Sequence, residues 1–136
     1  MCIRDRQKSI IDNVLGNQQS DGGWGLSSLG WTWRGTNLRS LVNLWIRSND
    51  MPLAGKSDGY ATGLIVYVLG QAGFPQEDPH LLRGRSWLVR NQNQTEGFWP
   101  GYSLVNRRDT SSGTGRFMND AATAYAVLAL AATNGR

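Results

Sequence analysis

The sequence predicts an all-α fold, and three observations carry that prediction. Apolar residues recur three and four positions apart in several segments, as at Ile10, Ile11, Val14 and Leu15, which places them on one face of a helix. Strict alternation of apolar and polar residues, the pattern of a half-buried strand, does not persist in any segment. The 17 glycines are expected mainly in turns, because glycine destabilises a helix interior by about 1 kcal/mol relative to alanine.

Five helices are expected along the chain. The predicted ranges are residues 7–18, 37–47, 58–71, 79–91 and 119–132. The third helix should end before Gly73, and the fourth should start at Asp78-Pro79, with the aspartate as cap and the proline at the first helical position. Asn119 or Asp120 is expected to cap the last helix.

Charge and cysteine content exclude several kinds of protein. The 14 Lys and Arg residues exceed the 10 acidic ones, for a net charge of +4, but they form no continuous basic stripe. A nucleic-acid partner is therefore not expected. Membrane contact is expected to be peripheral at most, since no apolar run approaches the roughly 20 residues that span a bilayer. Cys2 and His80 are the only cysteine and histidine, so we predict no disulfide, no metal site and no cofactor.

The first six residues, Met1 to Arg6, need separate treatment. They resemble the translation of a transposon-end adapter from a sequencing library, and on that interpretation they are not native. A natural N-terminal arm is the alternative. If the first interpretation holds, the domain comprises residues 7–136 and the native chain extends upstream.

Two turns rich in Gly and Trp repeat along the chain. Residues 17–24 read Asn-Gln-Gln-Ser-Asp-Gly-Gly-Trp, and residues 91–99 read Asn-Gln-Asn-Gln-Thr-Glu-Gly-Phe-Trp. The second is the first pattern with one residue inserted. Their tryptophans, Trp24 and Trp99, are 75 positions apart.

The segments after these turns repeat as well, but at a shorter spacing. Thr62 and Thr123 occupy matching places and are 61 positions apart. The difference between the two spacings, 75 less 61, gives the first unit about 14 extra residues, which lie within residues 26–56. We therefore divide the chain into a first unit at about residues 7–73 and a second at about 78–133.

Gln, Gly and Trp at these spacings can join successive helices. A Gln at a helix end can bond to backbone groups that the helix leaves without partners. Gly permits the left-handed turn that follows a helix, and Trp covers the junction while its N–H finds a partner. We interpret six residues as such a structural clamp: Gln18, Gly22, Trp24, Gln92, Gly97 and Trp99.

Together with the helix before it, the second turn resembles the QW repeat of squalene-hopene cyclases, with one extra residue. The residues that carry the resemblance are Arg83, Gly84, Trp87, Leu88, Gln92, Gly97 and Trp99. The first turn matches through Gln18, Gly22 and Trp24, whereas Asn13 stands where an aromatic residue is expected. The chain is thus similar to the terpenoid cyclase and protein prenyltransferase superfamily.

The resemblance implies an α/α toroid, in which an outer ring of helices surrounds an inner ring. A closed toroid of this superfamily needs about five or six helix pairs, and this chain supplies two to three. An incomplete ring leaves apolar end faces unburied. The resemblance therefore implies part of a larger bacterial protein, with the remainder of that protein as the first partner.

The resemblance also implies where a catalytic acid would lie. Bacterial triterpene cyclases of this superfamily protonate a polyene with an Asp-x-Asp-Asp-Thr-Ala segment at the start of an inner helix. In the matching residues 119–124, only Asp120 is acidic, and it stands at the variable position. In the other unit, Asp58 has no acidic partner and is interpreted first as a helix cap. Asp58 and Asp120 remain the catalytic candidates, without a complete acid motif.

Aromatic residues indicate a candidate ligand cleft. Its expected lining residues are Tyr60, Phe98, Tyr102 and Arg116, and the long connection at residues 99–117 would form its rim. In cyclases, aromatic faces stabilise carbocations by cation–π attraction, which would suit an apolar isoprenoid. A glycan or a peptide would suit a polar aromatic cleft equally, and packing of the turns onto the helices is the structural alternative.

Three functions remain open from the sequence. The first is a repeat region that binds or scaffolds without its own catalytic acid. The second is a fragment of a cyclase-like isomerase whose acid motif lies outside this chain. The third, a glycan-processing toroid, would need paired carboxylates from Asp58, Glu96 and Asp120.

Overall fold

The computed structural model describes residues 3–25, 56–101 and 113–132. Four α-helices make up 66% of these residues, and no strand occurs among them. The helices are α1 (Ile3–Gly16), α3 (Gly59–Gln71), α4 (Pro79–Asn91) and α5 (Gly113–Ala131). The predicted all-α fold is confirmed, while the helix predicted at residues 37–47 lies outside the described residues. None of the four helices is long and apolar enough to cross a membrane.

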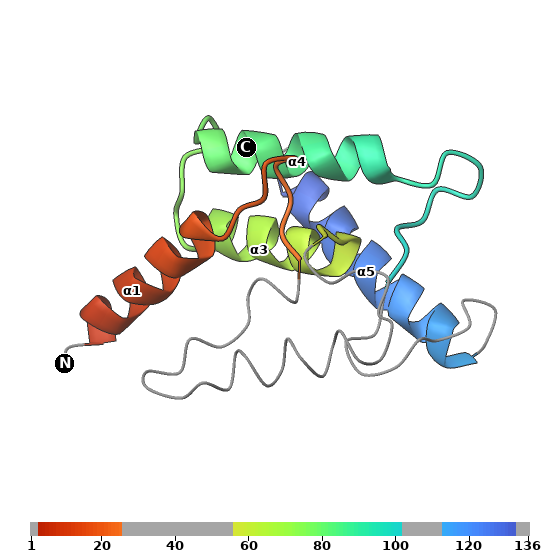
Figure 1. Ribbon diagram of the computed structural model, residues 1–136, viewed down its shortest axis with the longest axis horizontal. Helices are drawn as coiled ribbons and strands as arrows, with labels where there is room; N and C mark the ends of the chain where they lie inside the picture. The colour runs from red at the N-terminus through yellow and green to blue at the C-terminus, as the bar shows by residue number, and fades with distance from the viewer. Residues whose placement is uncertain (1–2, 26–55, 102–112, 133–136) are drawn as a thin grey trace.

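Successive helices run in opposite directions. In Figure 1, α1 and α4 run from left to right, whereas α3 and α5 return from right to left, with α5 rising obliquely. Helix α3 lies in the middle and packs against both α4 and α5, and its larger interface is with α5. In the described part of the chain, α3 is therefore the central helix, and α4 and α5 both pack on it.

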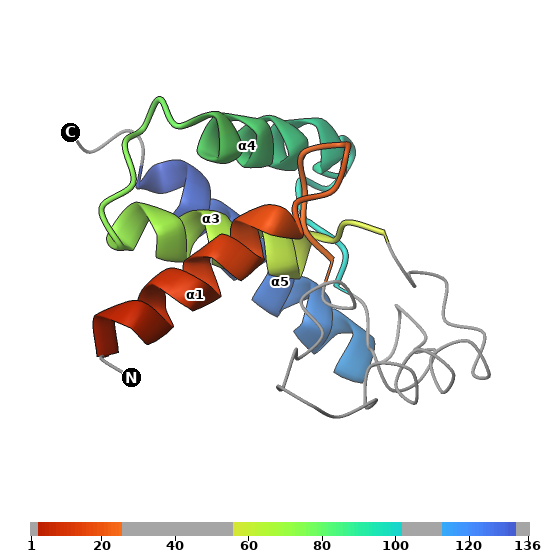
Figure 2. The ribbon, with the colours of Figure 1, turned by 60° about the vertical axis from the view of Figure 1, so that its left-hand side comes forward.

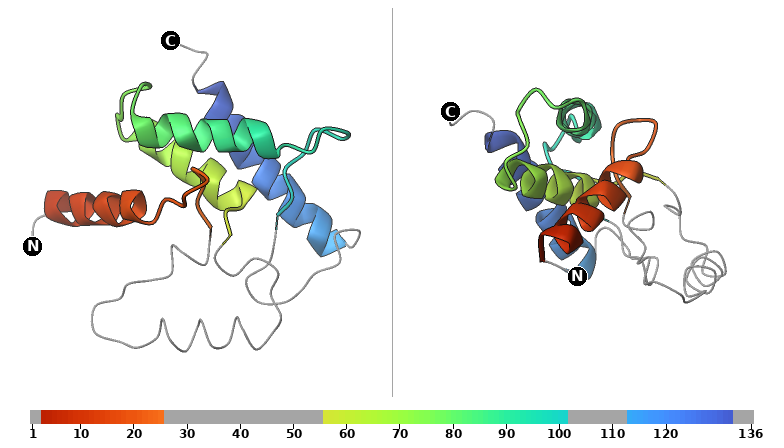
Figure 3. Two further views of the ribbon diagram at one scale, coloured as in Figure 1. Left: turned by 45° about the horizontal axis from the view of Figure 1, so that its top comes forward. Right: turned by 90° about the vertical axis from the view of Figure 1, so that its left-hand side faces the viewer.

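Helix α1 joins this core through its C-terminal half. Ile11, Val14 and Leu15 are partly buried against the core residues. Ile3, at the start of the N-terminal half, and Ile10, just past the middle of the helix, are largely exposed. Figure 3 shows that half projecting away from the other helices, and in Figure 2 the end of α1 passes in front of α3. Only the end of α1 next to the first Gly-Trp turn is thus held in place.

The core is built around the tryptophans of the two turns. Trp24 is fully buried and Trp99 is 3% exposed. They pack with apolar residues of α3 and α4 and with three buried alanines of α5, which are Ala122, Ala126 and Ala129. Burial of such large side chains is a main source of stability in a small helical domain.

Small residues let α3 and α5 approach closely. A Cβ atom added at Gly63 of α3 would lie 2.7 Å from the backbone nitrogen of Ala126 in α5. That separation is too short for a real contact, so any side chain at position 63 would push the helices apart. The absence of a side chain at Gly63 therefore sets the distance between the two helices.

The ends of α3 and α4 agree with the capping signals in the sequence. Asp58 precedes α3, and its Oδ1 accepts a hydrogen bond from the Ala61 N–H at 2.8 Å. The chain leaves α3 through Gly73, whose φ of 91° is in the left-handed region. Asp78 caps α4 by accepting from the His80 N–H, with Pro79 in the first turn. The predicted ranges of both helices are confirmed.

Helix α1 differs from its predicted range of residues 7–18. It begins at Ile3 and ends at Gly16, so residues 3–6 of the separately treated N-terminal segment are helical. Asp5 lies in the first turn, where a negative charge interacts favourably with the helix dipole. The arginines of this segment are also good helix formers, which explains the earlier start.

The prediction for the start of α5 is wrong. The helix begins at Gly113, six residues before Asn119, so neither Asn119 nor Asp120 is its cap. The Asn119 side chain instead accepts a hydrogen bond from the Gly101 N–H at 2.9 Å. A tertiary contact uses the amide oxygen that the sequence assigned to capping. The earlier start also shortens the connection predicted at residues 99–117.

Candidate functional site

Two turns with matching hydrogen bonds form the most distinctive feature of the structure. We call residues 17–25, which follow α1, turn 1, and residues 92–101, which follow α4, turn 2. In turn 1, Gln18 Nε2 donates to the Gly22 carbonyl at 2.8 Å, and in turn 2 Gln92 Nε2 donates to the Gly97 carbonyl at 2.6 Å. Each glutamine thus closes its own turn.

Each turn also requires a glycine at one position. Gly22 and Gly97 have φ values of 96° and 77°, in the left-handed region that glycine adopts without steric cost. At Gly22 there is a second reason, because an added Cβ would lie 2.8 Å from the Arg83 carbonyl oxygen. The glycines therefore allow the chain to reverse tightly, and at turn 1 they allow α4 to lie directly against it.

The indole of each turn bonds to the end of the preceding helix. Trp24 Nε1 donates to the Val14 carbonyl, and Trp99 Nε1 donates to the Leu88 carbonyl, both at 2.8 Å. Each carbonyl belongs to the last four of its helix, which have no partner within the helix. The tryptophan thus covers the helix end with its ring and satisfies one of its acceptors.

The backbone of each tryptophan bonds to the following helix. The Trp24 N–H donates to Thr62 Oγ1 at 2.9 Å, and that hydroxyl donates to the Trp24 carbonyl at 3.1 Å. The Trp99 N–H donates to Thr123 Oγ1 at 3.0 Å, and the hydroxyl lies 3.5 Å from the Trp99 carbonyl. Thr62 and Thr123 are visible in the sequence as a repeated pair, but their spacing alone indicates no role. Thr62 joins turn 1 to the first turn of α3, and Thr123 joins turn 2 to the middle of α5.

Turn 1 additionally binds the start of the next hairpin. Gln18 Nε2 donates to the His80 carbonyl at 3.0 Å, and Gln18 Oε1 lies 2.6 Å from His80 Nδ1. Arg83 Nη2 donates to the carbonyls of Gln19 and Ser20, at 3.2 and 3.1 Å. These bonds fix the N-terminal half of α4 against turn 1.

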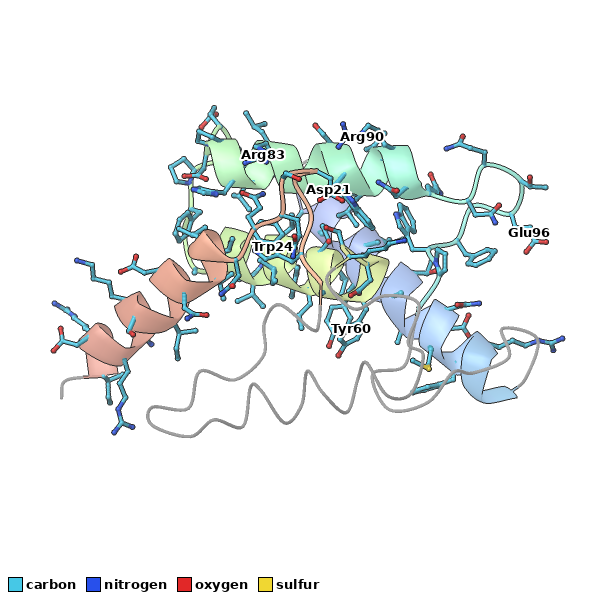
Figure 4. All side chains as sticks on the ribbon, in the orientation of Figure 1. Asp21, Trp24, Tyr60, Arg83, Arg90 and Glu96 are labelled. Carbon is cyan, nitrogen blue, oxygen red and sulfur yellow. The ribbon has the colours of Figure 1, made fainter. Side chains whose placement is uncertain are left out.

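Asp21 is the centre of this contact, and sequence reasoning gave it no role. Its Oδ1 accepts from the Gly23 N–H at 3.0 Å and from Ser57 Oγ at 2.7 Å, while its Oδ2 accepts from Trp87 Nε1 at 3.0 Å. Arg90 Nη2 donates to the Asp21 carbonyl at 2.9 Å. Figure 4 shows Asp21 in turn 1 next to α4, which carries the labelled Arg83 and Arg90. Its place directly before Gly22, matched by Glu96 before Gly97, was the available signal.

Two opposing effects act on the pKa of Asp21. Burial raises the pKa of this carboxyl, but the hydrogen bonds from Ser57, Gly23 and Trp87, with the charge of Arg90, outweigh burial, so the pKa is below its ordinary value. A carboxyl with a depressed pKa stabilises the folded state above its unfolded pKa of about 3.9. That stabilisation is lost as the pH falls through the lower folded-state pKa.

Replacement of Asp21 by alanine is expected to lower the free energy of unfolding by about 1–2 kcal/mol at pH 7, because the Trp87 N–H, on a nearly buried ring, loses its acceptor. Urea unfolding of both proteins measures the difference. Asp21→Asn keeps an acceptor and serves as the matched control for pH, since it cannot titrate. The difference in the free energy of unfolding between wild type and Asp21→Asn should become smaller below about pH 4. A difference that stays constant between pH 3 and 7 would contradict the role of the Asp21 charge.

The catalytic candidates do not form an acid pair in the described residues. Asp58 is buried, 6% exposed, and its carboxylate caps α3. Asp120 is exposed in the interior of α5 rather than at a helix start. Among the described residues, no group of three or more His, Cys, Asp or Glu side chains is placed to hold a metal ion.

The candidate cleft residues lie in different surroundings. Tyr60 packs edge-to-face against Tyr125, with ring centres 5.3 Å apart, on the side of α3 away from α4 (Figure 4). Phe98 is partly buried in turn 2, Arg116 is exposed on α5, and Tyr102 lies outside the described residues. A cavity of about 330 Å³ lies instead between turn 1 and α4, and none of these four residues lines it. Its lining residues are Ser20, Asp21, Leu82, Arg83, Ser86 and Arg90.

Comparison with models of protein families, with curated proteins and with solved structures gave no match.

Proposed function

We propose that the chain is a repeat region of the prenyltransferase and squalene-cyclase type within a larger bacterial protein, where it binds or scaffolds without a catalytic acid of its own. The observation that carries this proposal is the matched bonding of the two turns. In each, a Gln closes the turn, a buried Trp bonds to the helix before it, and a Thr on the next helix holds the Trp backbone. Repetition of one set of contacts is typical of repeat proteins.

The helix directions support an α/α toroid segment. Helices α1 and α4 precede turns 1 and 2, respectively, and α3 and α5 carry the threonines that bind those turns. We propose that α1 and α4 belong to an outer layer and that α3 and α5 belong to an inner layer. The close contact of α3 with α5, through Gly63, would then be the contact between neighbouring inner helices.

The surroundings of the acid candidates favour binding over catalysis. The Asp58 carboxylate accepts a backbone hydrogen bond at the start of α3, as a structural cap does. In the other unit, Asn119 bonds to Gly101 and Ala122 is fully buried, at two of the places where the resembling cyclases carry carboxylates. This chain would therefore serve as a binding or scaffold surface and would not donate a catalytic proton.

The test is to express both this chain and the complete product of its native gene, and to incubate each with squalene. We expect neither protein to form a cyclic triterpene detectable by gas chromatography with mass spectrometry. A cyclic product from the complete protein would contradict the scaffold proposal. If that product persisted in the Asp58→Asn and Asp120→Asn variants, the acid would lie outside this chain, as the cyclase alternative requires.

The cyclase alternative has one specific observation in its favour. Tyr60 and Tyr125 form a perpendicular aromatic pair on α3 and α5, the two helices that the proposal assigns to the inner layer. Aromatic faces can stabilise a carbocation. If the complete protein cyclises squalene, Tyr60→Leu should change the distribution of products more than Phe98→Leu, which alters a residue of turn 2. Equal effects would remove this argument.

A further inference from the structure

Within the described residues, the outer surface of α5 lacks the contacts that the matching surface of α3 makes. Gly63 of α3 lies against the backbone of α5, and Val66 of α3 lies against Gly84 of α4. The matching residues 61 positions later are Ala124 and Val127. Both are exposed, Val127 by 50%.

Turn 2 likewise has fewer partners than turn 1 in the part of the chain that the structure describes. Glu96 occupies the place of Asp21, directly before the left-handed glycine. Asp21 accepts a hydrogen bond from Trp87 of α4, whereas no described residue donates to the Glu96 carboxylate. Figure 4 shows Glu96 at the outer end of turn 2, away from all four helices.

We propose that these two regions form one docking surface, the trailing face, which binds a further helix hairpin of the same kind as α4–α5. Its residues are Gln92, Glu96, Ala124, Val127 and Leu128. This inference rests on the proposed repeat function and specifies how the next repeat is recognised. The occupant is defined by what turn 1 binds: a helix with two arginines seven positions apart and a tryptophan between them, as at Arg83, Trp87 and Arg90.

Charge and continuity both support this occupant. The Glu96 carboxylate and the carbonyls of turn 2 offer acceptors to a helix that carries guanidinium and indole donors. The apolar part of the surface is formed by Val127 and Leu128, and Val127 matches Val66, which lies against Gly84 of α4 in the existing contact. A docked hairpin would thus repeat an interface that the chain already contains.

A second copy of this chain, docked through its α1, does not fit. The indole bonds make Val14 of α1 the equivalent of Leu88 of α4, 74 positions later. With the same spacing, the α1 residues that match Arg83, Trp87 and Arg90 are, in that order, Ser9, Asn13 and Gly16. Helix α1 therefore lacks the donors that would meet Glu96.

The test is to extend the full chain by one hairpin in register. Residue 132 matches residue 71, so residues 1–132 are followed directly by a second copy of residues 72–132. With Cys2→Ser in place, a single thiol is introduced by Val127→Cys, and its alkylation rate is measured with and without the extension. Val68→Cys is the matched control, because Val68 is also 50% exposed but lies on α3, outside the trailing face.

We expect the extension to slow alkylation at position 127 by about tenfold or more, because labelling then requires local opening, and to leave position 68 unchanged. The protection should be lost when the second copy carries Arg83→Ser, Trp87→Asn and Arg90→Ala. Glu96→Gln should lower the urea midpoint more in the extended chain than in the original one.

Labelling at position 127 that stays as fast as in the original chain would overturn the proposal, whether the added hairpin fails to dock or fails to fold. Protection of position 127 in the original chain that grows with protein concentration would also overturn it, since the occupant would then be a second copy. Neither result depends on squalene turnover, so a failure here is distinct from a failure of the proposed function.

Discussion

Replacement of Trp99 by alanine is expected to lower the free energy of unfolding by about 3–5 kcal/mol. The indole is 3% exposed, so its removal leaves a large cavity in the core. The substitution also removes the donor to the Leu88 carbonyl at the end of α4. Urea or thermal unfolding followed by circular dichroism measures the loss.

Two control substitutions test whether burial of the indole causes this loss of stability. Trp24→Ala should cost a similar amount, because Trp24 is fully buried and makes the matching bond to Val14. Phe98→Ala should cost less, because Phe98 is only partly buried beside Trp99. A loss below about 0.5 kcal/mol for Trp99→Ala would mean that the indole is accessible in solution, and it would then become a candidate platform for a ligand.

Gly63→Ala is expected to destabilise the protein by about 2–3 kcal/mol, the cost of overpacking a core. In most helices this substitution stabilises, because alanine has the higher helix propensity. Here the new methyl group would lie 2.7 Å from the Ala126 nitrogen and 2.8 Å from the Tyr125 carbonyl carbon, both backbone atoms of α5. Neither atom can move without moving the helix. Chemical denaturation provides the measurement.

Gly70→Ala is the matched control in the same helix. An added Cβ at Gly70 meets no heavy atom within 4 Å, so the substitution should stabilise the protein by about 0.5–1 kcal/mol. Opposite signs at the two positions would show that the contact with α5, rather than helix propensity, decides the effect. Stabilisation by Gly63→Ala would contradict the close packing of α3 on α5.

The helices could be predicted where local signals agree with tertiary structure. Asp58, Gly73 and Asp78-Pro79 mark ends of α3 and α4, and each acts through neighbours within a few residues. The start of α5 could not be predicted in this way, because Asn119 has the chemistry of a cap but bonds to Gly101, 18 positions away. A residue with both local and distant acceptors or donors gives an ambiguous signal.

In the candidate site, too, local contacts could be predicted from the sequence and distant ones could not. The spacing of Gln18, Gly22 and Trp24 within one turn is visible in the sequence, since these residues act together over a few positions. The partners of Asp21 and Trp24 are not, because Trp87 and Thr62 come from 66 and 38 positions away. Only the repetition of the pattern in the second unit pointed to the threonines.

The bonds at Trp24 have a consequence for the 30 or so residues that the first unit carries between its turn and α3. The Asp58 N–H donates to the Trp24 carbonyl at 3.0 Å, so this stretch of chain leaves and returns at nearly the same point. The entropy of closing a loop grows only slowly with its length, by about 0.6 kcal/mol for each doubling. Because Trp24 and Asp58 hold the two ends of this stretch together, a change in its length would alter the entropy of loop closure only slightly.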